Sequence, residues 1–253
     1  MTDSPFAGRT VIVTGGSRGI GRATAIRLAA EGARVAVVYR SRKLDADATL
    51  EQIKQAGGQA VAISADIARP EEATRIAEQT RRAFGPIDML AHCAAISIVE
   101  PADDVTWETW KSVMDINLDG TYNIIYAVKD EMIDRRFGRI VVVSSIAALR
   151  ERANQVHYSA SKAAVIAVTR CLAQAWGKHN IRVNCMAPGL TKTEMSKLLS
   201  PQVTESIIEA TPLGRVGEPE EIAAVIRFLL SEESSFMTGQ TVVASGGRTM
   251  LPG

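Results

Sequence analysis

The chain has 253 residues, of which 46% are hydrophobic and 23% charged, as in an ordinary soluble globular protein. The formal net charge of +1 provides no global field for nucleic acid or an anionic membrane, so neither partner is expected. Cys93, Cys171 and Cys185 fit neither a disulfide framework nor a zinc site, and the N-terminus shows no apolar signal segment. No apolar run reaches the roughly 20 residues that span a bilayer. We therefore expect a cytoplasmic protein without a bound metal.

Short apolar runs alternate with longer helical patterns along the chain. The runs are nearly continuous, which is typical of parallel strands covered on both faces. We expect about seven strands, over Thr10–Thr14, Arg34–Tyr39, Ala60–Ser64, Ile87–His92, Arg139–Ser144, Ile181–Met186 and Gln240–Ser245. Helices are expected over Ile20–Glu31, Leu44–Ala56, Pro70–Ala83, Trp107–Arg135, Tyr158–Gly177 and Pro219–Leu230.

This alternation predicts an α/β fold: a single domain over residues 1–253, with a doubly wound parallel sheet of the Rossmann type and helices on both faces. Gly32, Gly57 and Gly177 stand where helices should end, and Pro70 and Pro219 suit first helical turns. Residues 189–217 interrupt the alternation with a long polar stretch. That stretch is either a lid over a site or a surface excursion without function.

A glycine-rich stretch, Thr14–Gly21, joins the first predicted strand to the first helix. Gly15, Gly19 and Gly21 allow a tight turn and a close approach to a pyrophosphate, and the next helix offers free N–H groups to the anion. The spacing differs from the commonest dinucleotide pattern, G-x-G-x-x-G. Its place at the first strand-to-helix turn nevertheless favours a dinucleotide site over a purely structural turn.

The residues after the second predicted strand bear on the choice of nicotinamide cofactor. NAD-binding chains usually carry an acid there, but Arg40 and Arg42 come first and no acid occurs before Asp45. With Arg18, these guanidinium groups would favour a 2′-phosphate. We expect NADP(H); NAD(H) is the alternative, with the arginines as solvated surface charges. Asp66, after the third strand, either bonds adenine or forms a turn or N-cap.

Tyr158 and Lys162 are four residues apart in a predicted helix and so share one face. A phenol titrates near pH 10, and a nearby ammonium would lower that pKa. Poising the phenol at neutrality needs a shift of about 3 units, to which an oxidised nicotinamide could add. Ser145, just past the fifth strand, offers a hydroxyl to orient a substrate oxygen. Taken alone, the tyrosine and lysine could equally be a surface pair.

Together these residues resemble the short-chain dehydrogenase/reductase family, from Thr14 to Gly247. Asp66, Asn117 and the segment Asn184–Gly189 match the family as well. The resemblance implies an NAD(P)-dependent oxidoreductase acting on CH–OH groups. It also implies that the tyrosine is the general acid in reduction and the general base in oxidation.

The resemblance implies a role for each site residue. Ser145 would hold the substrate oxygen, Lys162 would bind the nicotinamide ribose and tune Tyr158, and Asn117 would hold a water in a proton relay; Asn117 taken alone reads as an ordinary polar helix residue. Thr193 would bond the nicotinamide carboxamide. The implied cofactor contacts are Gly15, Ser17, Arg18, Gly19, Ile20, Gly21, Arg40, Asp66, Ile67, Ala94, Tyr158, Lys162, Pro188, Gly189 and Thr193.

One segment departs from the family pattern. Many members read Asn-Asn-Ala-Gly after the fourth strand, where this chain reads His92-Cys93-Ala94-Ala95. The departure puts the local cofactor geometry in question, because the amides brace the sheet and Ala95 adds a methyl group. A bolder alternative makes His92 and Cys93 a redox or metal pair, but no third ligand or second thiol stands nearby in sequence.

Within the family, the pattern is most similar to the beta-ketoacyl-[acyl-carrier-protein] reductases. Such reductases grip the acidic carrier protein through a basic pair, which falls here at Arg136 and at His179, a weaker cation. An acyl carrier protein is therefore a weakly supported partner beside a small-molecule carbonyl or alcohol substrate. Arg150 and Arg152, near the expected substrate entrance, either attract an anionic substrate or form a solvated rim.

Three functions remain open. The first is an NADPH-dependent reductase of a 3-oxoacyl thioester or small ketone, and the second is an NAD(P)-dependent sugar, polyol or alcohol dehydrogenase. The third is a catalytically idle binding protein, against which the intact set of Asn117, Ser145, Tyr158 and Lys162 argues. The resemblance also implies a homotetramer built on the two long helices, Trp107–Arg135 and Tyr158–Gly177.

Overall fold

The computed structural model describes residues 4–250, so the first three and last three residues of the expected domain lie outside it. Seven parallel strands form one sheet in the order β3-β2-β1-β4-β5-β6-β7. They are β1 (Thr10–Thr14), β2 (Arg34–Tyr39), β3 (Gln59–Ser64), β4 (Met89–His92), β5 (Gly138–Val143), β6 (Ile181–Pro188) and β7 (Thr241–Ala244). The predicted doubly wound sheet is confirmed, with β4 starting later and β6 ending later than expected.

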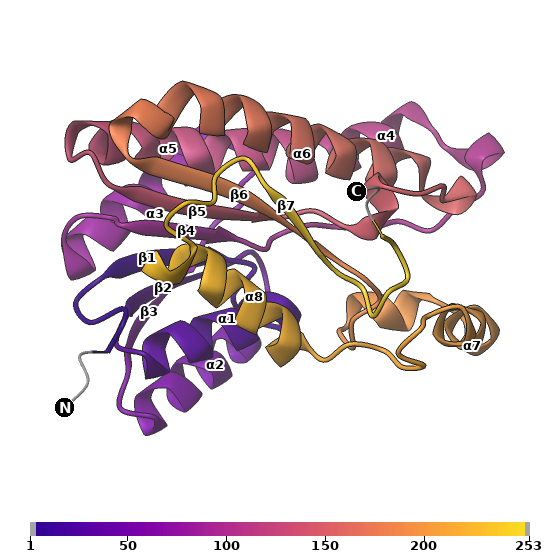
Figure 1. Ribbon diagram of the computed structural model, residues 1–253, viewed down its shortest axis with the longest axis horizontal. Coiled ribbons are helices and arrows are strands. Elements are labelled where there is room, and N and C mark those ends of the chain that lie inside the picture. Colours follow the sequence, from indigo (N-terminus) through magenta and orange to yellow (C-terminus); the bar gives the residue numbers. More distant parts are fainter. Residues whose placement is uncertain (1–3, 251–253) are drawn as a thin grey trace.

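Helices cover both faces of the sheet (Figure 1). One face carries α1 (Gly19–Ala30), α2 (Lys43–Gln55) and α8 (Pro219–Leu230), and the other carries α3 (Pro70–Phe84), α4 (Trp107–Met114), α5 (Gly120–Asp134) and α6 (Val156–Trp176). Pro70 and Pro219 open their helices as expected. Within residues 4–250, no helix is both long and apolar enough to cross a membrane.

The core explains why the strands are apolar without a break. Successive side chains of a strand point to opposite faces. On β1, Ile12 packs into the cluster beneath α3, α5 and α6, while Val11 and Val13 pack into the cluster beneath α1 and α8. All three side chains are fully buried. A sheet that is covered twice therefore favours apolar residues on both faces of its central strands.

The expected single helix over Trp107–Arg135 is wrong in its middle. The helical path is interrupted by a π-helical turn, Asp115–Asp119, between α4 and α5. A π turn inserts an extra residue and rotates the remainder of the helix, a device that is common at functional sites. Asn117 lies in this turn, fully buried. The π turn therefore directs the polar side chain of Asn117 toward the protein interior.

The ends of three helices were expected at glycines. Gly32 and Gly57 have φ of +89° and +76°, which only glycine adopts easily, and they confirm the expectation. Gly177 does not end α6 in this way: its φ is −54°, and a 3₁₀ turn continues to His179. The left-handed residue is Asn180, with φ of +59°, whose amide donates to the carbonyl of Arg136. Asparagine adopts this conformation more readily than other non-glycine residues, and here its side chain also joins the turn to the segment before β5.

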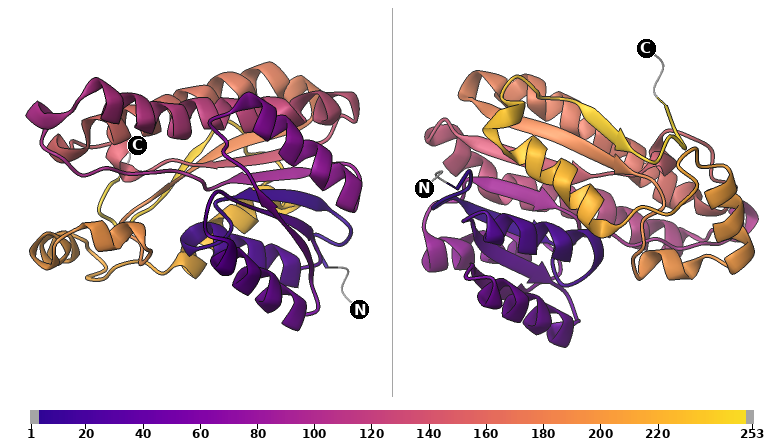
Figure 2. Two further views of the ribbon diagram at one scale, coloured as in Figure 1. Left: turned by 180° about the vertical axis from the view of Figure 1, so that it is seen from behind. Right: turned by 60° about the horizontal axis from the view of Figure 1, so that its bottom comes forward.

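Residues 189–217 leave the sheet between β6 and α8 and extend past the carboxyl ends of the strands (Figure 2). They contain a 3₁₀ turn, Met195–Leu198, and the helix α7 (Pro201–Glu209). A parallel bridge between Thr191 and Gly217 closes the base of the excursion, with main-chain hydrogen bonds of 2.9 and 3.0 Å on either side. Its function as a lid stays a prediction.

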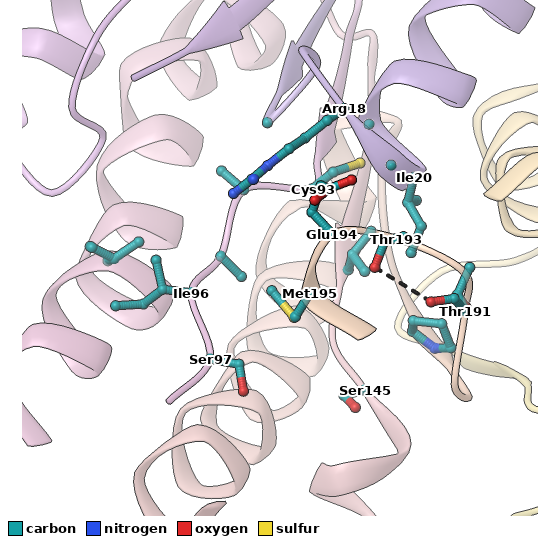
Figure 3. Close-up of a pocket in the computed structure, with 18 of the residues that line it drawn as sticks. Arg18, Ile20, Cys93, Ile96, Ser97, Ser145, Thr191, Thr193, Glu194 and Met195 are labelled. Atoms are coloured by element: carbon teal, nitrogen blue, oxygen red, sulfur yellow. Dashed lines mark hydrogen bonds between the residues drawn. The ribbon is translucent and has the colours of Figure 1, made fainter. Parts of the chain in front are cut away.

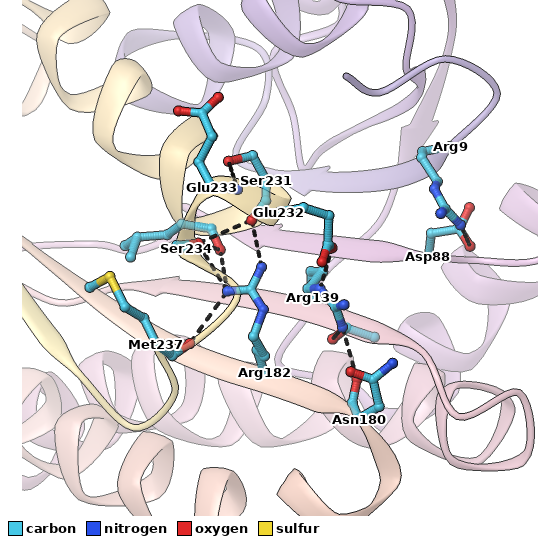
Figure 4. Close-up of polar contacts among 12 residues, drawn as sticks. Arg9, Asp88, Arg139, Asn180, Arg182, Ser231, Glu232, Glu233, Ser234 and Met237 are labelled. Carbon is cyan, nitrogen blue, oxygen red and sulfur yellow. Dashed lines mark hydrogen bonds and ion pairs between the residues drawn. The ribbon is translucent and has the colours of Figure 1, made fainter. Parts of the chain in front are cut away.

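Buried arginines form hydrogen bonds at the amino edge of the sheet, opposite the excursion (Figure 4). Arg182, at 6% exposure, donates to the carbonyls of Leu229, Ser231 and Met237 and to the hydroxyl of Ser234, at 2.7 to 3.3 Å. Burial, followed by the charge of Arg139, lowers the pKa of its guanidinium to about 10, so it stays cationic at neutral pH. Arg182 thus closes the turn after α8 onto β6.

Replacing Arg182 with Met should lower the free energy of unfolding by about 3 kcal/mol, because buried oxygens lose their charged donor. Urea unfolding followed by circular dichroism measures the loss. Arg82→Met, at an exposed position on α3, is the matched control and should change stability little. A loss at position 182 no larger than at position 82 would contradict the argument.

Candidate functional site

A pocket of about 320 Å³ opens at the carboxyl edge of the sheet (Figure 3). It runs from Arg18 at one end to Ser97 and Ser145 at the other. All but one of the site residues expected from sequence line it; the exception is Asn117, which lies behind the wall. The pocket also takes in residues that the sequence did not single out for a role, among them Ser97, Glu194 and Met195.

The glycine turn at the head of α1 is shaped for a close ligand. Gly15 and Gly19 have φ of +65° and +53°. A side chain at Gly21 would meet the carbonyl oxygen of Gly15 at 2.3 Å, and one at Gly15 would meet Ala94 at 3.0 Å. Helix α1 has no side-chain cap and no acid in its first turn. Its first N–H groups are therefore left for an anion, as the pyrophosphate of a dinucleotide requires.

Arginines surround the pocket where the second strand ends. Arg18, Arg40 and Arg42 all line it. Arg42 pairs with Asp45 at 3.6 Å, whereas Arg18 and Arg40 form no ion pair within residues 4–250. Glu194 reaches this region from the excursion: Lys197 first, then Arg18 and Arg42, lower the pKa of its carboxyl group. The end of the pocket is positively charged, with one acid beside it.

Asp66 and Ile67 line the pocket beyond the third strand. Asp66 Oδ1 accepts from the main-chain N–H of Ala68 at 3.1 Å, so the side chain forms a turn, and the N-cap of α3 is Arg69 instead. The N-cap alternative for Asp66 is therefore wrong. The carbonyl of Ile67 is held by the buried amide of Asn123 at 3.0 Å. A second oxygen of Asp66 remains available to the pocket.

The segment that departs from the family pattern is braced by Thr14. The Thr14 hydroxyl accepts from the N–H of Ala94 at 3.2 Å and forms a hydrogen bond of 2.8 Å with His92 Nδ1. The other ring nitrogen of His92, Nε2, is buried and has no partner within residues 4–250. Burial, followed by the charge of Lys162, lowers the pKa of His92 to about 3, which keeps the ring neutral.

A redox or metal function of this segment finds no support. Burial raises the pKa of the Cys93 thiol to about 12, so the reactive thiolate is scarce at neutral pH. Within residues 4–250, no three His, Cys, Asp or Glu side chains gather into a group that could hold a metal ion. His92 is buried beside the glycine turn, and Cys93 lines the pocket together with Ala94 and Ala95 (Figure 3).

Tyr158 and Lys162 lie side by side on α6, as their spacing predicts. The ammonium Nζ of Lys162 is 5.9 Å from the centre of the Tyr158 ring and donates to the carbonyl of Val143 at 2.7 Å. Both side chains are buried and line the pocket. Ser145 follows β5 and accepts from the N–H of Ala147 at 3.1 Å, which leaves its hydroxyl proton for a ligand. A phenol, an ammonium and a hydroxyl thus share one cavity.

The expectation that the ammonium lowers the pKa of Tyr158 is wrong for the protein without ligands. Burial is the largest influence and raises the pKa of the phenol, while the Ser145 hydroxyl and the charge of Arg152 act in the opposite direction. Burial likewise lowers the pKa of Lys162 to about 8. Desolvation outweighs the influence of Ser145 and Arg152 on the pKa of the phenol, so Tyr158 holds its proton at neutral pH.

Asn117 acts as a clamp in the π turn. Its amide group forms two hydrogen bonds of 2.9 Å to the main chain of Ile96 and donates to the Ser161 hydroxyl at 3.1 Å. The side chain therefore joins the segment after β4 to α6, one turn from Tyr158. Since these contacts occupy the amide, the expected water relay through Asn117 stays a proposal.

A buried histidine beside the tyrosine also fixes α6. His157 Nδ1 accepts from the main-chain N–H of Tyr158 at 2.8 Å, so its Nε2–H donates to Glu100 at 2.9 Å. The ring caps an otherwise free N–H group of the first helical turn. The sequence does not mark His157 as a site residue, because one histidine in a helix carries no periodic or motif signal.

The expected carrier-protein pair lies away from this pocket. Arg136 donates to the carbonyl of Lys178 at 2.9 Å, which brings it beside His179. Arg136 and His179 come just before β5 and β6 respectively, and so lie at the amino edge of the sheet. The pocket lies at the carboxyl edge. Within one chain the pair and the reactive residues are at opposite ends of the strands.

The fold and this site can be compared with known proteins. A family model described as enoyl-(acyl carrier protein) reductase matches residues 15–249. The 3-oxoacyl-[acyl-carrier-protein] reductase of Synechocystis sp. is 37% identical over 96% of this chain and 98% of its own length. The 3beta-hydroxysteroid dehydrogenase 1 of Eggerthella lenta is 36% identical over 97% of this chain and 95% of its own.

Solved structures agree with these relatives. Levodione reductase superposes with a TM-score of 0.93 at 33% identity, over 96% of this chain and 98% of the other. The 3-oxoacyl-[acyl-carrier protein] reductase of Brucella melitensis gives a TM-score of 0.90 at 35% identity, over 96% and 92% of the two chains. The chain therefore belongs to the short-chain dehydrogenase/reductase family and is an NAD(P)-dependent oxidoreductase of CH–OH groups.

Proposed function

We propose that this protein is an NADP(H)-dependent reductase that converts a ketone, either a 3-oxoacyl thioester or a small carbonyl compound, into a secondary alcohol. The observation that carries the proposal is the buried, protonated phenol of Tyr158 beside Ser145, in the pocket that begins at the glycine turn. Reduction of a ketone requires a proton at the carbonyl oxygen, and a neutral phenol in a dry pocket supplies it as a general acid.

Each reactive side chain has a step of its own. The nicotinamide, when bound, supplies the hydride. Ser145 donates a hydrogen bond that orients the ketone oxygen toward Tyr158. Lys162, cationic below about pH 8, binds the ribose and stabilises the phenolate after the proton has left. Asn117 positions α6 through Ile96 and Ser161 and thereby sets the place of the phenol.

The cofactor is assigned to the rest of the pocket. The turn from Gly15 to Gly21 would hold the pyrophosphate, and Arg18 with Arg40 the 2′-phosphate, since neither arginine has an ion pair within residues 4–250. Asp66 and Ile67 would border the adenine. Ala94, Pro188, Gly189 and Thr193 would border the ribose and nicotinamide, and all of them line the cavity.

NAD(H) use in the oxidative direction is the second candidate. Glu194 favours it, because its carboxylate lies near Arg18 and Arg42 and weakens the positive charge there. The enzyme would then be an NAD(P)-dependent sugar, polyol or alcohol dehydrogenase. An acyl carrier protein as partner, a cytoplasmic location, a catalytically idle role and the lid at 189–217 stay predictions.

A panel of ketones and alcohols, assayed with both NADPH and NADH, tests the proposal. It should include an acetoacetyl thioester, a neutral ketone, a sugar alcohol and a hydroxysteroid. Ketone reduction with NADPH should exceed every oxidation with NAD at neutral pH. Faster alcohol oxidation with NAD would favour the second candidate, and no turnover in either direction would favour the idle protein.

The cofactor preference has a test of its own. Arg40→Gln removes one charged donor to the 2′-phosphate, so kcat/KM for NADPH should fall by about 10- to 100-fold. The value for NADH should change little, because NADH has no phosphate at that position. Arg82→Gln, which removes the same charge from an exposed part of α3, is the control. Equal losses with both cofactors would contradict the assignment.

The tetramer is proposed through α5 and α6. Tyr122 and Tyr126 on α5 are 51% and 37% exposed and stack with ring centres 4.0 Å apart. Tyr126 also meets Trp176 of α6 edge-on at 6.0 Å, so the exposed faces of the two tyrosines form an apolar surface beside both helices. Light scattering coupled to gel filtration measures the assembly.

A further inference from the structure

A second group of arginines stands at the far end of the pocket from the cofactor region. Arg152 lines the pocket, and the charges of Arg150 and Arg248 act on its guanidinium. Arg150 donates to the carbonyl of Arg248 at 3.2 Å, which fixes the two together. Each of the three is partly buried, although each carries a full charge. Three guanidinium groups that repel one another and lose solvent need an anion nearby.

No carboxylate of the described chain provides that anion. Within residues 4–250, none of the three arginines forms an ion pair, and Glu151, the acid between two of them in sequence, is exposed and unpaired. The Nε atoms of Arg152 and Arg248 are buried without a hydrogen-bond partner. Burial, followed by the charges of its two neighbours, lowers the pKa of Arg152. Among the residues that the structure describes, the charge of this arginine group is therefore uncompensated.

The position of Arg152 separates it from the cofactor arginines. Its carbonyl accepts from the N–H of Gln155 at 2.9 Å, and the Gln155 amide donates to Ser97 at 2.7 Å. Ser97 and Ser145 mark the end of the pocket opposite Arg18 (Figure 3). Arg152 also acts electrostatically on the Tyr158 phenol, which places the guanidinium on the substrate side. A 2′-phosphate held by Arg18 leaves Arg152 free.

We propose that the substrate is an anionic ketone or its alcohol, and that Arg152 binds its carboxylate or phosphate while Tyr158 faces its carbonyl oxygen. This substrate class rests on the proposed reductase function. A planar guanidinium forms two parallel bonds to either anion, so Arg152 acts as a specificity residue. Arg150 and Arg248, whose charges act on Arg152, would add to the attraction without lining the pocket. Val99, Ile146 and Leu199 line the same cavity and suit a short apolar body between the two polar ends.

Substrate pairs provide the test, since both members of each pair carry the same keto group and only one of them carries the anion. The pairs are acetoacetate and levulinate with their ethyl esters, and dihydroxyacetone phosphate with dihydroxyacetone. For at least one pair, kcat/KM should be higher for the anion, and Arg152→Gln should lower the anion-to-neutral ratio by about 10- to 100-fold. The ratio cancels any effect of Arg152 on Tyr158 itself. Arg152→Lys should retain part of the preference, and Arg82→Gln all of it.

A binding measurement separates this proposal from the reductase function. Calorimetry with a Tyr158→Phe variant and NADPH reports binding of the preferred anion without turnover, and adding Arg152→Gln should weaken it. Neutral ketones reduced as well as the anions, with a ratio that Arg152→Gln leaves unchanged, would overturn the anionic substrate and keep the reductase. Anion binding that depends on Arg152 without turnover of any ketone would overturn the reductase and keep the anion site. Neither binding nor turnover would overturn both.

Discussion

Tyr158→Phe is expected to lower kcat for ketone reduction by about 1,000-fold, the middle of the usual range for loss of a general acid. The change deletes one oxygen and keeps the ring. The position is only 8% exposed, so bulk water cannot readily deliver the proton in its place. Steady-state oxidation of NADPH measures the rate, and fluorescence of bound NADPH should show unchanged affinity.

The control for this variant is Tyr122→Phe, which makes the same chemical change at a site on α5 that is 51% exposed. It should keep wild-type turnover. Retention of full activity in Tyr158→Phe would mean that another group donates the proton. Loss of NADPH affinity together with activity would point to a misplaced α6 instead.

Lys162→Met should reduce kcat/KM at least about 100-fold, since the phenolate loses its counter-charge and the ribose loses a donor. The pH profile identifies the cause. Burial lowers the pKa of Lys162 to about 8, so the group is an ammonium below that pH and a neutral amine above it. With subsaturating NADPH, the wild-type rate of reduction should fall as pH rises through about 8. The Lys162→Met variant should not show this fall in rate near pH 8.

The lowered pKa of Lys162 also affects how the free energy of unfolding depends on pH. The dependence has the opposite sign to that of a salt-bridged lysine, whose pKa is raised on folding. Between the folded pKa of about 8 and the ordinary value of 10.5, the unfolded chain keeps a proton that the folded chain releases. The contribution of Lys162 to the free energy of unfolding therefore rises with pH across that window. Urea unfolding of the ligand-free protein should show the rise in wild type. Its persistence in Lys162→Met would assign it to another group.

Local patterns were enough to predict the fold. Both faces of β1 are covered, so Val11, Ile12 and Val13 form a continuous apolar run. Such a run can be recognised from the sequence alone. The glycine turn was equally legible, since positive φ at Gly15 and Gly19 demands glycine. The spacing of Tyr158 and Lys162 predicted that they share a helix face, because helical geometry depends only on neighbours in sequence.

Electrostatics could not be predicted from sequence, because burial is a property of the whole fold. A nearby ammonium suggested a lowered pKa for Tyr158, and the enclosing pocket reverses that direction. Arg152 appeared as one of two charges in a loop, with a solvated rim as its alternative. Only the packing of that loop against Arg248, from the far end of the chain, leaves the charges partly buried and without an acidic partner among residues 4–250.

By itself, then, the sequence determined the order of strands and helices, the phosphate turn, and the identity of the phenol, ammonium and hydroxyl. These depend on short-range periodicity and on the stereochemistry of single residues. The tertiary structure decided which charges lose water, how Asn117 enters a π turn to clamp Ile96, and that His92 binds Thr14 in place of an amide brace. Those outcomes join segments distant in the chain, and solvation depends on everything that surrounds a group.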